Sequence, residues 1–163
     1  MKSKFLTFAF FAALASFTFN ACSDDDDAVA ESDIAGSYTG KHTASMVAGN
    51  GNEYVLPEND AAVVSIVDNG DGTITVTTPE WALGTSEQAI IYTGYDLTVQ
   101  LNDDGTFSQH FDNGIKSLSN RGNVIEFAAQ FDGTVNEADK QMTYVLELNH
   151  ASSHFVITFD GSK

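Results

Sequence analysis

From Ile34 to the C-terminus the sequence alternates apolar and polar residues with a period of two, and almost no apolar stripe has helical spacing. The clearest stretch is 125–135, where Phe127 and Phe131 share one face while Glu126 and Gln130 share the other. Side chains of a β-strand point alternately to the two faces of its sheet, so this pattern predicts half-buried strands. One apolar and one polar face per strand is typical of an antiparallel sheet around a core. We therefore expect an all-β domain, either a closed barrel or a sandwich.

Turn-forming residues divide this region into about eight short antiparallel strands. The sequences 68–72, 102–105 and 112–114 are rich in Asp, Asn and Gly, and 136–140 contains Asn and Asp; each predicts a turn. Residues 47–60 predict a long loop, and 79–84 break the alternation. We expect strands over 38–46, 61–67, 73–78, 94–101, 106–111, 125–135, 142–148 and 155–159, with weaker segments at 89–91 and 115–119.

The N-terminus has the pattern of a bacterial lipoprotein signal. Lys2 and Lys4 precede an uncharged apolar run over 5–19, and Ala21 stands directly before Cys22, the only cysteine. We interpret residues 1–21 as a signal peptide and Cys22 as the lipid attachment site, so the protein would be anchored in a membrane by acyl chains. The alternatives are a transmembrane helix, which four aspartates at 24–27 cut short, and ordinary cleavage after Ala30.

Residues 22–33 form an acidic tether between this site and the domain at 34–163. The aspartates at 24–27 repel each other and favour an extended linker. They are also similar to the acidic signal that directs lipoproteins of the Bacteroidota to the cell surface. The two interpretations are compatible, and the second one places the lipid-anchored domain at the cell surface, on the outer membrane.

Charge and cysteine content exclude several classes of function. The chain has 23 Asp and Glu against 7 Lys and Arg, and removal of the signal peptide would make it more acidic still. Such a surface repels phosphate backbones and anionic lipid, so nucleic acid is not an expected partner. With Cys22 acylated no thiol remains for a disulfide, a thiolate metal site or cysteine catalysis.

Several motifs resemble the calycin-like β-barrel family of Bacteroidota lipoproteins over residues 34–160. They are the opening Ile34-Ala35-Gly36-Ser37-Tyr38-Thr39-Gly40, the hairpins Asp71-Gly72-Thr73 and Asp104-Gly105-Thr106, the segment around Trp81, and the last Gly133-Thr134-Val135 and Met142-Thr143-Tyr144 hairpin. The resemblance implies a single up-and-down, calycin- or lipocalin-like barrel of about eight antiparallel strands. It implies no catalytic residues, because the family has no agreed ones.

Strand parity places several polar aromatic side chains inside such a barrel, and these are our candidate ligand contacts. A buried tyrosine or histidine needs a hydrogen-bond partner, which could be a neighbour, water or a ligand. The alternative is a core without a cavity, filled by Phe107, Phe111, Phe127, Phe131, Phe155 and Phe159. The inward candidates are Tyr38, His42, Tyr95 and Tyr144, with Met46 beside them.

Trp81 is the fifth candidate contact. It lies in the irregular segment 79–84, which we expect to be exposed, with Tyr54, Tyr92 and Glu80 as possible neighbours. An aromatic plane beside a carboxylate suits stacking on a sugar ring, whereas a tryptophan that caps the mouth of a barrel would be ordinary packing.

No sequence motif indicates catalysis. His150 and His154 supply only two of the donors that zinc requires, and 68–72 lacks the spacing and distant glutamate of a calcium loop. We assign no catalytic residue, metal site or cofactor. The main hypothesis is a non-enzymatic surface lipoprotein that binds a small apolar or glycan-derived ligand or another envelope protein. The alternatives are a structural or interaction module with a filled core, and a hydrolase using carboxylates of 47–60.

Overall fold

The structure is a computed structural model of the whole chain, and it describes residues 33–55, 57–83 and 89–163. All the described residues belong to one compact unit, 31–163. The predicted signal peptide, Cys22 and nearly all of the predicted tether lie outside the described residues. Within the described ranges no helix has the length and apolar character needed to cross a membrane.

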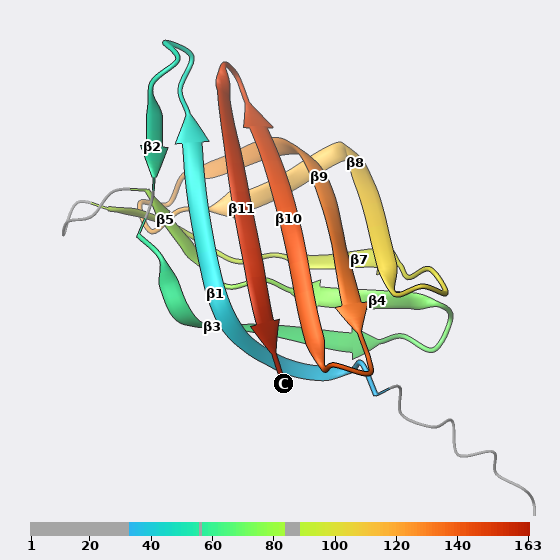
Figure 1. Cartoon of the computed structure of the whole chain (residues 1–163). Helices are drawn as coiled ribbons and strands as arrows, with labels where there is room; N and C mark the ends of the chain where they lie inside the picture. The colour runs from blue at the N-terminus through green and yellow to red at the C-terminus, as the bar shows by residue number, and fades with distance from the viewer. Residues whose placement is uncertain (1–32, 56, 84–88) are drawn as a thin grey trace, which may run out of the picture. The chain divides into compact units, whose positions relative to one another are not determined.

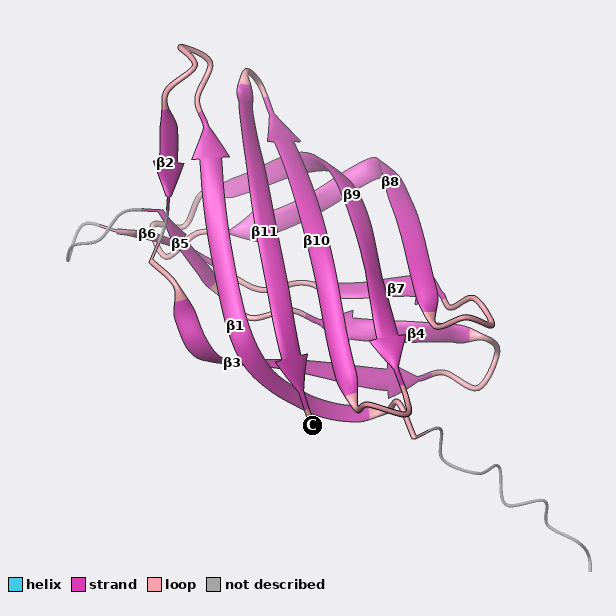
Figure 2. Cartoon of the chain, in the orientation of Figure 1, coloured by secondary structure: helices cyan, strands magenta, loops and turns pink. Residues whose placement is uncertain are grey.

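The described part of the second unit is built from eleven strands (Figure 2). Their bounds are β1 (Gly36–Val47), β2 (Glu53–Val55), β3 (Asn59–Asp68), β4 (Thr73–Thr77), β5 (Trp81–Leu83), β6 (Ile90–Tyr92), β7 (Asp96–Gln100), β8 (Thr106–Leu118), β9 (Val124–Asn136), β10 (Gln141–His150) and β11 (Ser153–Ser162).

Eight of these strands form one strongly curled, nearly closed antiparallel sheet in the order β7-β4-β3-β1-β11-β10-β9-β8 (Figure 1). Neighbouring strands in the sheet are consecutive in the chain, apart from the short β2, β5 and β6. The exception is the pairing of the first strand, β1, with the last, β11. The short strand β2 pairs with β1, and β5 and β6 form a separate hairpin. The expectation of an all-β, up-and-down sheet is thus confirmed at this level.

The two end strands of the sheet, β7 and β8, are connected by a turn at one end of the seam, and the β5–β6 hairpin links the two edges at the other end. Tyr92 forms an isolated antiparallel bridge with Ser119. On either side of it the Thr93 amide donates to the Leu118 carbonyl at 3.0 Å, and the Asn120 amide donates to the Ile91 carbonyl at 2.8 Å. The hairpin therefore joins the two edges of the sheet at one end of the seam.

The up-and-down path gives the sheet two ends with different connections. One end carries the β3–β4, β7–β8 and β9–β10 turns together with the start of β1 and the C-terminus (Figure 1). There the Lys163 ammonium donates to the Asp33 and Ala35 carbonyls, each at 2.5 Å. The other end carries the β1–β2, β8–β9 and β10–β11 connections and the β5–β6 hairpin.

Two expected interruptions differ in the structure. Residues 47–60 are not one loop, because β2 pairs with the end of β1 and β3 already begins at Asn59. The turn expected at 112–114 is a bulge inside the continuous strand β8, where the register with β9 shifts between Phe111 and Ile115. Gly114 has a φ of 68°, so turn-forming residues are used here to bend a long strand rather than to end it.

The core lies on the concave face and is rich in aromatic side chains. Burial alternates residue by residue, most regularly along β10. Removing each large apolar side chain from water contributes about 1.5–3 kcal/mol. The largest fully buried side chains are Tyr38, Tyr144, Phe107, Phe127, Phe131, Phe159, Ile74, Met142, Leu146, Leu148, Ile157 and Val64.

Candidate functional site

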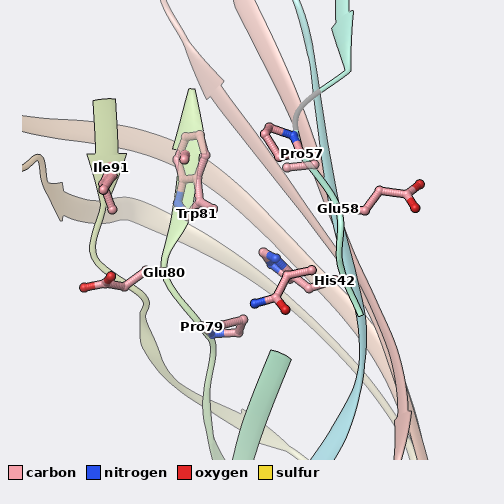
Figure 3. Close-up of a pocket in the computed structure, with 10 residues that line it drawn as sticks. His42, Pro57, Glu58, Pro79, Glu80, Trp81 and Ile91 are labelled. Carbon is pink, nitrogen blue, oxygen red and sulfur yellow. The ribbon is translucent and has the colours of Figure 1, made fainter. Parts of the chain in front are cut away.

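A cavity of about 410 Å³ opens between β1, the start of β3 and the segment that enters β5 (Figure 3). It lies toward the end of the sheet that carries the β5–β6 hairpin. Its size is within the range of small-molecule sites. The lining residues come from four separate stretches of sequence: His42, Ala44, Pro57, Glu58, Asn59, Pro79, Glu80, Trp81, Ala82 and Ile91.

Local irregularities of β1 and β3 form one wall of the cavity. The register between the two strands shifts between Gly40 and His42, after which His42 is paired with Asn59. On the outside, the Lys41 ammonium forms a 2.7 Å ion pair with Glu58. Pro57 has no amide hydrogen to donate to a neighbouring strand, and it lies at the cavity just before β3 begins.

The opposite wall is fixed by the crossing of the β4–β5 connection over Gly94. The Thr78 amide donates to the Tyr95 carbonyl at 2.8 Å, and the Tyr95 amide donates to the Thr78 hydroxyl at 2.9 Å. A Cβ at Gly94 would lie 1.9 Å from the Thr78 carbonyl oxygen, so only glycine permits this approach. The chain then places Pro79, Glu80 and Trp81 across the cavity from His42 (Figure 3).

Trp81 is part of the core, so the expectation that it lies in an exposed segment is wrong. It is 3% exposed. Its indole stacks on the Tyr92 ring with centroids 4.5 Å apart, and it meets the edges of Phe127 and Phe155 at 6.2 and 5.5 Å. Pairing of β5 with β6 sets Trp81 opposite Tyr92, which explains the burial. Because one face is stacked on Tyr92 and so little of the side chain is exposed, the indole offers no open platform for a sugar ring.

His42 is the most distinctive group in the cavity. It is 4% exposed, and its Nε2 has no hydrogen-bond partner among the described residues. Burial lowers the pKa of its imidazole to about 4, so the side chain is neutral at physiological pH. Its ring extends from β1 toward Pro79 and Trp81 (Figure 3). A neutral imidazole can donate or accept at this nitrogen, depending on its tautomer.

The other three candidate residues are buried as strand parity predicted, but they do not line this cavity. The Tyr38 hydroxyl donates to the Ile34 carbonyl at 2.8 Å. Tyr144 stacks on Phe159, and burial raises the pKa of its hydroxyl. Burial also raises the pKa of Tyr95, while Ser117 and Trp81 beside it act in the opposite direction.

Three further buried polar atoms resemble His42 Nε2 in having no geometrically acceptable hydrogen bond within the described residues: Trp81 Nε1, Tyr95 Oη and Tyr144 Oη. Trp81 lies close enough to the Tyr95 hydroxyl to lower its pKa, but the two side chains form no hydrogen bond. The structure therefore joins two of the five candidates, His42 and Trp81, at one cavity and distributes the others through the core.

Sequence reasoning missed much of the cavity lining. Ala44 had the parity of His42, so it could have been included. Pro57 and Pro79 were visible as breaks in the strand pattern, but nothing in that pattern brings the two breaks together. Ile91 reaches the cavity only because the β5–β6 hairpin folds back on the sheet.

The two histidines near the β10–β11 turn are engaged separately. His150 Nδ1 lies 3.0 Å from the Glu126 carbonyl, and His154 Nδ1 lies 2.9 Å from the Asn149 side-chain oxygen. Within the described part of the chain, no group of three or more His, Cys, Asp or Glu side chains is placed to hold a metal ion. Residues 68–72 form a hairpin turn, as expected, in which Asp71 accepts hydrogen bonds from the Thr73 amide and hydroxyl.

Comparison with known proteins found no protein-family model, no curated protein and no solved structure that matches the chain. The functional argument below therefore rests on the cavity and on the sequence.

Proposed function

We propose that this chain is a non-enzymatic lipoprotein, anchored through acylated Cys22 at the outer membrane and exposed at the cell surface, whose curled sheet binds a small ligand. The sheet would be the calycin-like barrel that the sequence motifs resemble. The observation that supports the binding role is a cavity lined by His42, whose buried Nε2 has no hydrogen-bond partner among the described residues.

The energetics of His42 favour a bound group at this site. A buried polar atom without a partner costs about 1–3 kcal/mol. That cost is offset if the atom faces a space in which a ligand or water can hydrogen-bond to it. The wall combines the apolar groups of Pro57, Pro79 and Trp81 with the polar side chains of His42 and Asn59, and such a mixture of apolar and polar groups occurs in ligand sites.

The direction of the acidic side chains favours binding over hydrolysis. The Glu58 and Glu80 carboxylates point away from His42 on opposite sides of the cavity (Figure 3). Carboxylate-based hydrolysis needs two such groups flanking one bond. We therefore propose no reaction for this site. The orientation of Glu58 gives no support to the hypothesis of a hydrolase using carboxylates of 47–60.

The second candidate function is a structural or interaction module whose core is filled. The central core supports it, because Phe107, Phe127, Phe131 and Phe159 are all essentially inaccessible. In that case the cavity would hold only water, and the domain would serve as a spacer on the lipid anchor.

Native mass spectrometry of the protein purified from its own membranes tests the proposal. We expect the acyl mass on Cys22 and a co-purified small molecule that dissociates on activation. The Ala44→Leu variant, which places a larger side chain in the cavity wall, should retain the acyl mass and lose the small molecule. Wild-type protein that carries the acyl group but no small molecule, and binds none from a membrane extract, would favour the spacer.

A further inference from the structure

We propose that the cavity binds a short extended peptide, which adds as a strand to the free edge of β5 and places a basic side chain beside Glu80. This inference rests on the proposed binding function and adds the chemical class of the ligand. It follows from the unpaired backbone edges on the two sides of the cavity and from the charge of its rim.

One side of the cavity is an unpaired edge of β5. Ile91 directs its backbone groups away from β5, because its carbonyl accepts from the Asn120 amide at 2.8 Å and its amide donates to the Asn120 side chain at 3.2 Å. Backbone direction alternates along a strand, so the neighbours of Ile91 make the hydrogen bonds between β6 and β5. Ala82 is opposite Ile91 in this pairing. Its N–H and C=O are therefore directed to the other edge of β5, which pairs with no strand of the described chain.

The other side begins where β3 separates from the segment that leads into β5. The Asn69 amide donates to the Thr73 carbonyl at 3.1 Å, which fixes the alternation of hydrogen-bonded pairs between β3 and β4. The ladder ends at Ser65, and the next hydrogen-bonded position would set Val63 opposite Pro79. Proline has no N–H to donate, so the two strands part here. The backbone of Val63 is left without a strand partner on this side.

A peptide backbone is a close chemical complement to this gap. Residues 57–59 line it on the β3 side and residues 79–82 on the β5 side (Figure 3). The lining mixes carbon surface with polar groups. Asn59 already replaces a missing strand partner, because its side-chain oxygen accepts from the Ala61 amide at 3.1 Å. An extended peptide presents N–H and C=O groups at the spacing of a strand edge, with side chains between them.

The rim of the cavity favours a basic peptide over an acidic one. Glu80 is exposed at the rim and forms no ion pair with another described residue. Glu58 is paired with Lys41 at 2.7 Å, and the lining itself contains no lysine or arginine. A basic side chain beside Glu80 would gain a charge-assisted contact, whereas an acidic one would be repelled. The formal net charge of −16 likewise disfavours a second copy of this chain as the strand donor.

Affinity selection from capped peptide pools tests the inference on the full mature chain carrying Cys22→Ser. The pools are acetyl-X-X-Lys-X-X-amide and acetyl-X-X-Glu-X-X-amide, where X is Ala, Val, Thr, Leu or Ser. We expect retained peptides from the lysine pool, and fewer and weaker ones from the glutamate pool. In an NMR titration the best peptide should shift the Ala82 amide resonance saturably and slow its hydrogen exchange. N-methylation along one edge of that peptide should weaken binding about tenfold or more, because it removes the donors to β5, and along the other edge it should not.

Several outcomes overturn the inference. They are no retained peptide from either pool, an Ala82 amide that does not respond to the best peptide, N-methylation tolerated on both edges, and equal or better retention from the glutamate pool. The binding function fails separately, when the native mass spectrum of the purified protein also shows no bound molecule. A bound molecule that is not a peptide would leave the binding function standing and overturn only the inference.

A pair of proline variants locates the binding edge. Ala82→Pro removes an N–H that the sheet does not use, so the fold should tolerate it and peptide binding should be lost. The matched control is Thr98→Pro on β7. The Thr78 amide donates to the Tyr95 carbonyl, so by the same alternation the backbone of Thr98 also lies on a free edge. This control should bind the peptide as the wild type does. If Ala82→Pro does not fold, the exchange of the Ala82 amide in the wild type still decides the question.

Discussion

Four buried side chains carry a polar atom that nothing in the described part of the chain satisfies: His42, Trp81, Tyr95 and Tyr144. All four were identified from the sequence as possible ligand contacts, three of them by strand parity alone. Tyr38, the fifth, differs because its hydroxyl has a protein partner, the Ile34 carbonyl. Side chains with the same predicted inward position therefore differ in energy: the Tyr38 hydroxyl is stabilised by a hydrogen bond, whereas those of Tyr95 and Tyr144 have none among the described residues.

The neutral state of His42 predicts that acid destabilises the fold. Its pKa falls from 6.5 to about 4 on folding because of burial. The unfolded chain therefore binds the extra proton between these values, and stability that is complete above pH 6.5 is lost as pH falls toward 4. The loss from this residue amounts to about 3 kcal/mol. Chemical denaturation from pH 7.5 to 4.5 measures it.

The matched control for this pH dependence is His42→Phe, which should lack the loss in the same window. Glu58 and Glu80 also line the cavity, so Glu80→Gln should be examined with it. The lowered pKa values of Asp71 and Asp104 arise from hydrogen bonds of Thr73 and Thr106, and those carboxylates contribute to stability changes only at lower pH. An equal slope in the wild type and in His42→Phe would contradict the assignment.

Two tyrosine-to-phenylalanine changes should have opposite effects on stability. Tyr144→Phe removes a hydroxyl that has no hydrogen-bond partner among the described residues, so the free energy of unfolding should stay the same or rise by about 1 kcal/mol. Tyr38→Phe removes the donor to the Ile34 carbonyl and should lower it by about 1 kcal/mol. Urea denaturation of both variants under the same conditions gives the comparison. A loss of more than about 1 kcal/mol in Tyr144→Phe would show that its hydroxyl is satisfied.

At the scale of elements, the same five-residue turn is used twice. Asn69 to Thr73 and Asn102 to Thr106 share the pattern Asn-x-Asp-Gly-Thr. In each turn the asparagine side chain donates to the threonine hydroxyl at 2.9 Å, and the aspartate accepts from that hydroxyl at 2.6 Å. These local hydrogen bonds explain why both turns could be located from the sequence.

The glycines of these turns predict a graded effect of alanine. Gly70 and Gly105 have φ values of 75° and 78°, which cost a residue with a Cβ about 1–2 kcal/mol. A Cβ at Gly70 meets nothing within 4 Å, whereas one at Gly105 lies 2.3 Å from the Val135 carbonyl oxygen. Gly70→Ala should therefore destabilise by about 1 kcal/mol, and Gly105→Ala by at least about 3 kcal/mol, because the Val135–Gly105 contact must open.

Thermal unfolding of both variants measures this difference. Gly105 is also bonded directly to β9, because the Val135 amide donates to the Gly105 carbonyl at 2.8 Å. Equal losses in the two variants would mean that the β7–β8 turn can move away from β9 at little cost.

At the scale of the whole molecule, the proposed acyl anchor at Cys22 predicts where the acidic domain is found. The chain carries a formal net charge of −16, so its surface alone would not hold it on an anionic bilayer. Cys22→Ser should therefore move the protein from the membrane fraction to the soluble fraction of the cell. Fractionation with immunodetection measures this, and Ala30→Asp, at the alternative cleavage site, is the matched control that should remain membrane-bound. Continued membrane association of Cys22→Ser would contradict lipidation.

The alternation of apolar and polar residues determined which residues form strands and which side chains enter the core. Tyr38, His42, Tyr95 and Tyr144 are buried as parity required, and the turns at 68–72 and 102–105 follow from their own side chains. These features depend on near neighbours in the chain, so the sequence specifies them directly.

Only the tertiary structure decided the cavity, the burial of Trp81 and the continuity of β8. The cavity joins His42, Pro57, Pro79 and Ile91, which are far apart in sequence and meet because the sheet curls and the β5–β6 hairpin folds back on it. Trp81 is buried because Tyr92 lies opposite it. The alternation predicts the face of the sheet on which a side chain lies. It does not predict the cross-strand neighbour, because that depends on pairing between strands that are distant in the sequence.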